Sequence, residues 1–259
     1  MYLFNKILKV NLIRPEIKLA IIKGRGNIKD AFPSDFSSND KHLIETVSGT
    51  TMTSHERQIS LLRSVEYIVN NKLSGAIVEC GVWRGGSMAL VARKLIQMKD
   101  NNRKLFLFDT FEGMPPATDD DQNALNQRAA KILLDELDKM KGDNVWCYSG
   151  LDEVKRNLAE TGYPSANIIY RKGRVEDTLP DDAIDEIALL RLDTDWYEST
   201  KHELETLFDK LVPGGIMIID DYGHWSGAKK AVDEFFANRK IFPFLNRIDY
   251  TGRLFIKNH

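Results

Sequence analysis

Four short apolar runs in the sequence each end on an acidic residue or directly precede one. The runs span residues 76–79, 105–108, 187–192 and 216–219, and the acidic residues are Glu79, Asp109, Asp193 and the pair Asp220 and Asp221. Helix-like segments separate these runs, and strands that alternate with helices and are apolar throughout form a mainly parallel sheet covered on both faces. The carboxyl ends of such strands meet at the edge of the sheet where ligands bind, so we expect the acidic residues to gather there.

Helical spacing of apolar residues and one turn-rich stretch indicate how the chain is organised. We expect helices at residues 55–70, 87–99, 126–141, 151–161, 200–211 and 229–239, with Ser87 as a cap, and further strands at 168–170 and 253–256. Residues 32–40 are turn-rich and predict a loop. We therefore predict an N-terminal extension or lid over residues 1–55 and one Rossmann-like α/β domain over residues 56–259.

Composition excludes several classes of protein. Of the 259 residues, 42% are hydrophobic, which is enough for a sizeable core, and the formal net charge of −2 gives no sign of a nucleic-acid partner. Only Cys80 and Cys147 are present, which is typical of free thiols in a reducing cytoplasm rather than of a disulfide framework. No run of 18 apolar residues exists, so we expect no membrane span.

The first 30 residues form a basic amphipathic pattern. Apolar residues alternate there with Lys6, Lys9 and Arg14. The lysines interrupt any apolar core of a secretory signal, so we reject a signal peptide. The pattern is compatible with peripheral contact with an anionic membrane, but we favour an arm packed on its own domain or on a partner subunit.

The loop after the first apolar run is the expected cofactor site, and two types of cofactor are candidates for it, a dinucleotide and S-adenosylmethionine. Its sequence, residues 79–86, lacks the glycine spacing of a dinucleotide site, because Trp83 occupies the place of the second glycine. S-adenosylmethionine has no phosphate and carries positive charge on its amino and sulfonium groups, which suits Glu79. Asp109, at the end of the second run, is placed to bind both ribose hydroxyls.

Three aspartates suggest a metal site. Asp193, Asp220 and Asp221 end two runs that should be neighbouring strands, and hard divalent cations such as Mg²⁺ prefer oxygen ligands. Asp195 is either a further ligand or a cap of the next helix, and we favour the cap. His224 and Trp225 follow directly and are candidates for contact with a substrate, although Trp225 is equally compatible with the core and His224 with the surface.

Several motifs in collinear order over residues 45–240 resemble the macrocin O-methyltransferase family. The matching runs are residues 51–53, 79–86, 108–115, 173–180, 192–197, 220–222 and 230–234. The resemblance implies a class I methyltransferase fold with a seven-stranded sheet, an oligomer, and S-adenosylmethionine- and Mg²⁺-dependent methylation of a hydroxyl of a sugar, whether on an antibiotic, a polysaccharide or another glycan. It implies metal ligation by Asp193, Asp220 and Asp221, with Asp193 also the general base.

The same resemblance assigns the cofactor site. The residues expected to line it are Thr51, Met52, Glu79, Gly81, Trp83, Asp109, Phe111, Gly173 and Arg174, where Arg174 stands in place of an expected aromatic residue. Two alternative functions rest on the residues alone: a nucleotide-binding oxidoreductase, which the Trp83 loop disfavours, and a metal-dependent hydrolase, which lacks a histidine cluster. A non-catalytic factor in polysaccharide assembly is a third alternative.

Overall fold

The computed structural model describes residues 32–129 and 146–258. The chain divides into two compact units, residues 1–41 and 42–259, and helix α3 (Ser38–Glu45) crosses the division. At the start of α3, Ser37 and Asp40 bond reciprocally, each backbone N–H to the other's side chain at 3.1 Å. The amphipathic segment of residues 1–30 lies outside the described residues, as does most of the helix expected at 126–141.

The second unit is built on a seven-stranded sheet in the order β3-β2-β1-β4-β5-β7-β6. The strands are β1 (Ala76–Cys80), β2 (Leu105–Asp109), β3 (Ile168–Lys172), β4 (Ile187–Leu192), β5 (Leu211–Ile219), β6 (Asn246–Arg247) and β7 (Arg253–Ile256). Strands β1 to β5 pair in parallel, whereas β6 and β7 are antiparallel additions at one edge. The prediction of a mainly parallel sheet is confirmed.

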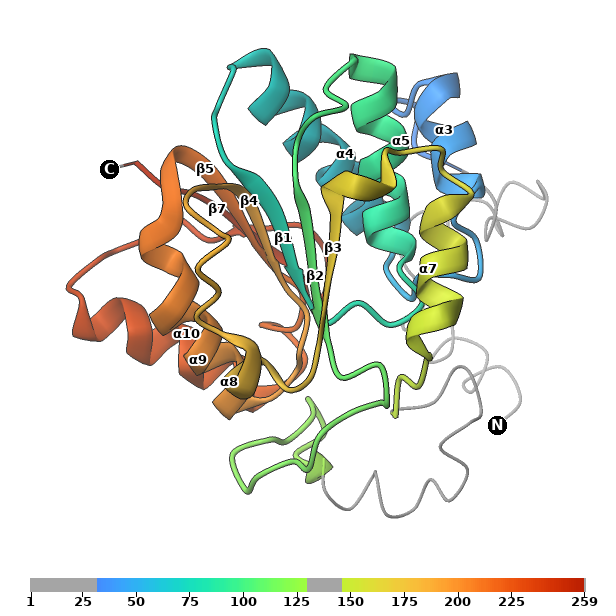
Figure 1. Ribbon diagram of the computed structural model, residues 1–259. Coiled ribbons are helices and arrows are strands. Elements are labelled where there is room, and N and C mark those ends of the chain that lie inside the picture. The colour runs from blue at the N-terminus through green and yellow to red at the C-terminus, as the bar shows by residue number, and fades with distance from the viewer. Residues whose placement is uncertain (1–31, 130–145, 259) are drawn as a thin grey trace, which may run out of the picture. The chain divides into compact units, whose positions relative to one another are not determined.

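Helices cover both faces of this sheet, as expected (Figure 1). One face carries α4 (His55–Asn70), α5 (Gly86–Met98) and α7 (Leu151–Ala159), and the other carries α8 (Val175–Thr178), α9 (Tyr197–Leu207) and α10 (Ser226–Asn238). Because both faces are covered, all residues of β1 and β4 are buried, which explains why their sequences are apolar except for Glu79 and Arg191. No helix in the described part of the chain combines the length and the apolar character that crossing a membrane requires.

Local structure differs from expectation at several places. The loop expected at residues 32–40 is cut short, because α3 begins at Ser38. Ser87 does not cap α5, because Gly85, in a left-handed conformation, occupies the capping position. Strand β5 begins at Leu211 rather than at 216, since its pairing with β4 jumps from Leu211 to Ile216 and leaves the Pro-Gly-Gly stretch of 213–215 outside the ladder. The two-residue strand β6 was not expected, because it has no apolar alternation.

The loop after β1 lies directly against the loop after β4. Asp193 N–H donates to the Cys80 carbonyl at 2.8 Å, and Gly81 takes a φ of +84°. A Cβ atom on Gly81 would lie 1.9 Å from the Asp193 carbonyl oxygen. The two loops therefore approach so closely that only glycine fits at position 81.

We predict that Gly81→Ala destabilises the protein by at least about 3 kcal/mol, through left-handed strain and a backbone clash together. Gly162 is the matched control, because its φ of +76° carries the same strain while a Cβ there would meet nothing within 4 Å. Gly162→Ala should cost only about 1–2 kcal/mol. Urea denaturation measures both variants, and equal losses would contradict the close approach of the loops.

Candidate active site

A cavity of about 470 Å³ opens at the carboxyl edge of the sheet. The ends of β1 to β5, residues 50–53 and the hairpin turn at Tyr250 and Thr251 line it. Most candidate site residues are among its lining: Thr51, Met52, Gly81, Trp83, Asp109, Gly173, Arg174, Asp193, Asp220, Asp221, His224 and Trp225. Glu79 and Phe111 do not line it, although both were expected at the cofactor.

Asp109 holds two backbone segments of the cavity wall together. Its Oδ2 atom accepts hydrogen bonds from the N–H groups of Val82 and Trp83 at 2.6 and 3.1 Å, and its Oδ1 accepts from the N–H of Phe111 at 2.6 Å. Burial raises the pKa of Asp109, while these backbone hydrogen bonds lower it. The carboxylate thus fixes the loop after β1 to the turn after β2, and Phe111 contributes a backbone donor to this arrangement.

Trp83 lies at the centre of the loop after β1. Its backbone is left-handed, with φ of 48°, and its buried indole Nε1–H has no acceptor among the described residues. Next to it, the N–H of Gly86 donates to the Thr50 carbonyl at 3.0 Å, which holds residues 50–53 against the start of α5. An unsatisfied buried donor in a cavity wall indicates a place for a polar ligand atom.

Arg191 lies buried at the centre of this edge and lines the cavity. Its guanidinium forms ion pairs with Glu79 at 2.7 Å, Asp193 at 2.7 Å and Asp220 at 2.9 Å, residues that come from or directly follow β1, β4 and β5. Burial alone would lower the pKa of Arg191, but the charges of Asp193, Asp220 and Glu79 raise it above its ordinary value. Burial raises the pKa of Glu79 to about 7, against the lowering effect of Arg191. Glu79 is therefore a partner of Arg191 inside the sheet.

Arg57 extends this arrangement toward α4 and the hairpin. Its guanidinium pairs with Asp220 and, at 3.1 Å, with Asp249, which also accepts a hydrogen bond from the Ser54 hydroxyl at 2.6 Å. Positive and negative groups thus alternate in an unbroken series from Asp249 through Arg57 and Asp220 to Arg191. Asp220 is enclosed by two arginines, which neutralise its charge.

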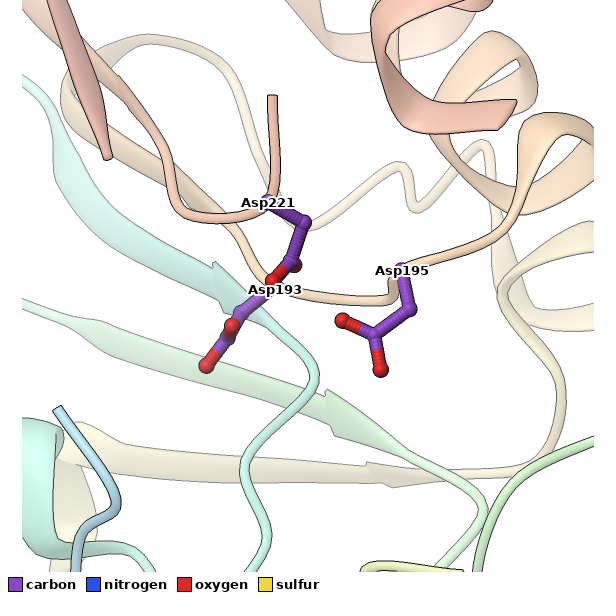
Figure 2. Close-up of side chains that lie close together, drawn as sticks. All are labelled: Asp193, Asp195 and Asp221. Carbon is purple, nitrogen blue, oxygen red and sulfur yellow. The ribbon is translucent and has the colours of Figure 1, made fainter. Parts of the chain in front are cut away.

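Asp193, Asp195 and Asp221 form a second group, here called the acidic cluster (Figure 2). One carboxylate oxygen from each lies within 4.8 Å of the others. The structure thus brings Asp195 together with Asp193 and Asp221, whereas Asp220, the third expected ligand, faces the two arginines. The expectation that Asp195 caps the next helix is wrong, because Trp196 is the capping residue of α9 and Asp195 has a φ of +66°.

The acidic cluster has more negative charge than its surroundings neutralise. Among the described residues, neither Asp195 nor Asp221 forms an ion pair, and Asp221 Oδ2 is buried without a hydrogen-bond partner. Burial raises the pKa of Asp195 to about 7, and burial with the charges of Asp195 and Asp220 raises the pKa of Asp221 well above its ordinary value. Carboxylates whose pKa values are raised by burial and by the charges of neighbouring carboxylates fit a hard divalent cation, which would compensate their negative charge.

Aromatic side chains form the wall of the cavity beside the acidic cluster. The His224 ring meets Trp225 at 4.9 Å and Tyr250 at 5.9 Å between centroids. Trp225 is only 7% exposed and packs edge-on against Trp196 at 4.9 Å, so it is largely a core residue with one side on the cavity. Burial lowers the pKa of His224, which keeps the imidazole neutral at pH 7. A neutral histidine between aromatic rings can hydrogen-bond an uncharged polar ligand.

Sequence reasoning overlooked several residues of this site: Arg57, Arg191, Asp249 and Tyr250. Only Arg191 left a readable signal, as a charged residue inside the otherwise apolar run of 187–192. A buried charge in a strand must be paired, so it pointed to carboxylates on the neighbouring strands. The other three lie outside the motifs and reach the site only through tertiary structure.

We predict that Arg191→Met destabilises the protein by about 3–5 kcal/mol at pH 7, because the buried Glu79 and Asp220 and the half-buried Asp193 lose their cation. The folded-state pKa values of Glu79 and Asp193 then rise further above the unfolded ones, so the loss should be larger at pH 8 than at pH 5. The control is Arg63→Met, which breaks an exposed pair with Glu66 and should cost less than about 1 kcal/mol at either pH. Denaturation at both pH values measures this, and a loss that shrinks as pH rises would contradict it.

Comparisons with known proteins agree with this geometry. A family model described as macrocin O-methyltransferase (TylF) matches residues 33–257. Demethyldecarbamoylnovobiocin O-methyltransferase of Streptomyces niveus is 30% identical over 252 residues, which cover 92% of this chain and 90% of that protein. A tetracenomycin-C rhamnosyl 4'-O-methyltransferase of Streptomyces olivaceus is 32% identical over 202 residues, covering 78% of this chain and 73% of that protein.

A solved structure gives the same result for the fold. The O-methyltransferase NovP is 32% identical to this chain, with a TM-score of 0.68, over 81% of this chain and 83% of that one. Neither alternative, the oxidoreductase or the hydrolase, is supported by these relatives. The match over nearly the whole length, on a class I fold with a carboxylate-rich cavity, shows that the chain belongs to the macrocin O-methyltransferase family of S-adenosylmethionine-dependent O-methyltransferases.

Proposed function

We propose that this protein transfers the methyl group of S-adenosylmethionine to a hydroxyl group of a sugar, with Mg²⁺ held by the acidic cluster and Asp193 as the general base. The observation that carries the proposal is the acidic cluster, which lines the same cavity as the loop after β1. A relative whose name specifies a rhamnosyl 4'-O-methyltransferase supports a sugar as the acceptor.

The cofactor half of the cavity lies between residues 50–53, the loop after β1 and residues 173–174. We assign Thr51, Met52, Gly81, Trp83, Asp109, Gly173 and Arg174 to it, because all of them line the cavity. S-adenosylmethionine supplies the methyl group as an electrophile on a positively charged sulfur. The nearby carboxylates therefore favour binding of the positively charged cofactor over binding of its demethylated product, whose sulfur is neutral after transfer. Glu79 and Phe111 support this half through Arg191 and Asp109 rather than by contact.

The acceptor half holds the hydroxyl that is to be methylated. A bound Mg²⁺ would lower the pKa of that hydroxyl and fix its direction. We assign Asp193, Asp195 and Asp221 as ligands, and Asp193 also as the base that takes the hydroxyl proton, a role worth roughly 10²–10⁴-fold in rate. Arg191, 2.7 Å from Asp193, fixes the orientation of this carboxylate. The space for the sugar ring is walled by the side chains of His224, Trp225 and Tyr250.

We predict that Asp109→Ala and Asp109→Asn each weaken binding of S-adenosylhomocysteine by at least about tenfold. A methyl group accepts none of the hydrogen bonds that the carboxylate accepts from the backbone N–H groups, and an amide cannot accept all of them. Calorimetry measures the affinity. Glu112→Gln is the matched control: it lies in the same turn but pairs with Lys172 on the surface, and its affinity should stay unchanged. Full affinity of both Asp109 variants would remove Asp109 from the cofactor site.

We predict that Asp193→Asn lowers kcat by roughly 10²–10⁴-fold without rescue by Mg²⁺, since the base is lost. Asp195→Asn and Asp221→Asn should instead raise the Mg²⁺ concentration needed for half-maximal rate, and excess Mg²⁺ should restore part of the activity. Asp220→Asn separates the two groups of carboxylates: it should lower thermal stability with little change in the Mg²⁺ requirement, because Asp220 faces the arginines. Full activity of the wild type in chelator would refute the metal assignment.

A further inference from the structure

Two phenylalanines beside the edge of the sheet are exposed to an unusual degree. Phe242 is 95% exposed and Phe244 84%, and both lie in residues 241–245, here called the aromatic loop, between α10 and β6. The other members of the loop alternate with them, since Ile241 and Leu245 pack against the main core. In an extended segment alternate residues point to opposite sides, so both phenylalanines face away from the protein together.

The aromatic loop has a basic setting. Arg239, Lys240 and Arg247 flank it, and residues 239–247 contain no acidic residue. Arg239 is neutralised by Asp209, with contacts of 2.5 and 3.1 Å. Lys240 and Arg247 form no ion pair among the described residues, and Arg247 donates only to the carbonyls of Asp249 and Tyr250. Phe242 and Phe244 thus stand in the sequence between two cations that no carboxylate of the described residues neutralises. Such a segment suits a surface that is anionic outside and apolar within.

The size and charge of the aromatic loop argue against a second copy of this chain, or its own N-terminal segment, as the group that covers it. Two phenylalanine side chains offer at most about 500 Å², whereas a stable interface takes about 800 Å² from each partner. A symmetric contact between two copies would also place Lys240 and Arg247 against the same cations. Residues 1–30 are themselves basic in pattern, so their charge does not complement the loop either.

We propose that the aromatic loop is a membrane-surface anchor, which inserts Phe242 and Phe244 among the headgroups of an anionic bilayer while Lys240 and Arg247 contact the lipid phosphates. This contact is peripheral and is separate from the cavity, because no residue of the loop lines it. It goes beyond the proposed function and does not depend on the identity of the acceptor. It would place the enzyme at a bilayer, where lipid-carried acceptors are concentrated.

The full-length protein tests this in sedimentation with vesicles of phosphatidylcholine alone or with about one third phosphatidylserine. The wild type should bind the anionic vesicles, weakly bind the neutral ones, and dissociate in high salt. The double variant Phe242→Ser/Phe244→Ser should lose at least about tenfold in partitioning to the anionic vesicles. Its melting temperature and its turnover of a water-soluble acceptor should be unchanged, because both side chains are exposed and outside the cavity.

Leu125→Ser is the matched control, since Leu125 is 76% exposed but follows the acidic run Asp119 to Asp121 in the sequence, and it should bind vesicles as the wild type does. Absence of wild-type binding to anionic vesicles would overturn the proposal. So would a double variant that binds as tightly as the wild type, which would assign the contact to another segment. A double variant whose mass in light scattering drops to that of a smaller oligomer, with vesicle binding intact, would overturn it in favour of a second copy.

Discussion

The contact between Arg191 and three carboxylates is the constraint on which the rest of the site depends. A guanidinium that is only 5% exposed costs much solvation energy, and only close, multiple pairing offsets it. Glu79, Asp193 and Asp220 supply that pairing from three adjacent strands. One cation therefore fixes the relative position of the loops on which cofactor and acceptor are proposed to bind.

The acidic residues at this edge fall into two groups with different physical roles. Glu79, Asp220 and Asp249 face arginines and hold the architecture together. Asp195 and Asp221 face each other and Asp193, with no arginine between them. The arginines thus neutralise only part of the acidic edge and leave the remaining negative charge concentrated at one point of the cavity. Asp193 belongs to both groups, which joins the structural pairing to the proposed chemistry.

The sequence predicted much of the fold and the location of the site, but not the partners within it. Apolar runs reveal buried strands, and residues that follow such runs necessarily come to one edge, so Asp109, Asp193 and Asp221 were found. That Asp195 joins the acidic cluster while Asp220 faces arginines was not predictable, because it depends on a left-handed backbone at Asp195 and on which side chain reaches an arginine. Arg57 and Asp249 are 192 positions apart, and no local pattern joins them.

The fit of Gly81 against the carbonyl of Asp193 has a consequence for how such enzymes diversify. Where these two loops meet, main chain lies against main chain, so under the proposed function the spacing between methyl donor and acceptor depends there on backbone contact as well as on Arg191. Side chains such as His224 and Tyr250, which line the cavity where the sugar is proposed to bind, can then be exchanged in evolution without altering this backbone contact. A lineage can acquire new acceptors by changing the rim of the cavity while the geometry of donation is inherited unchanged.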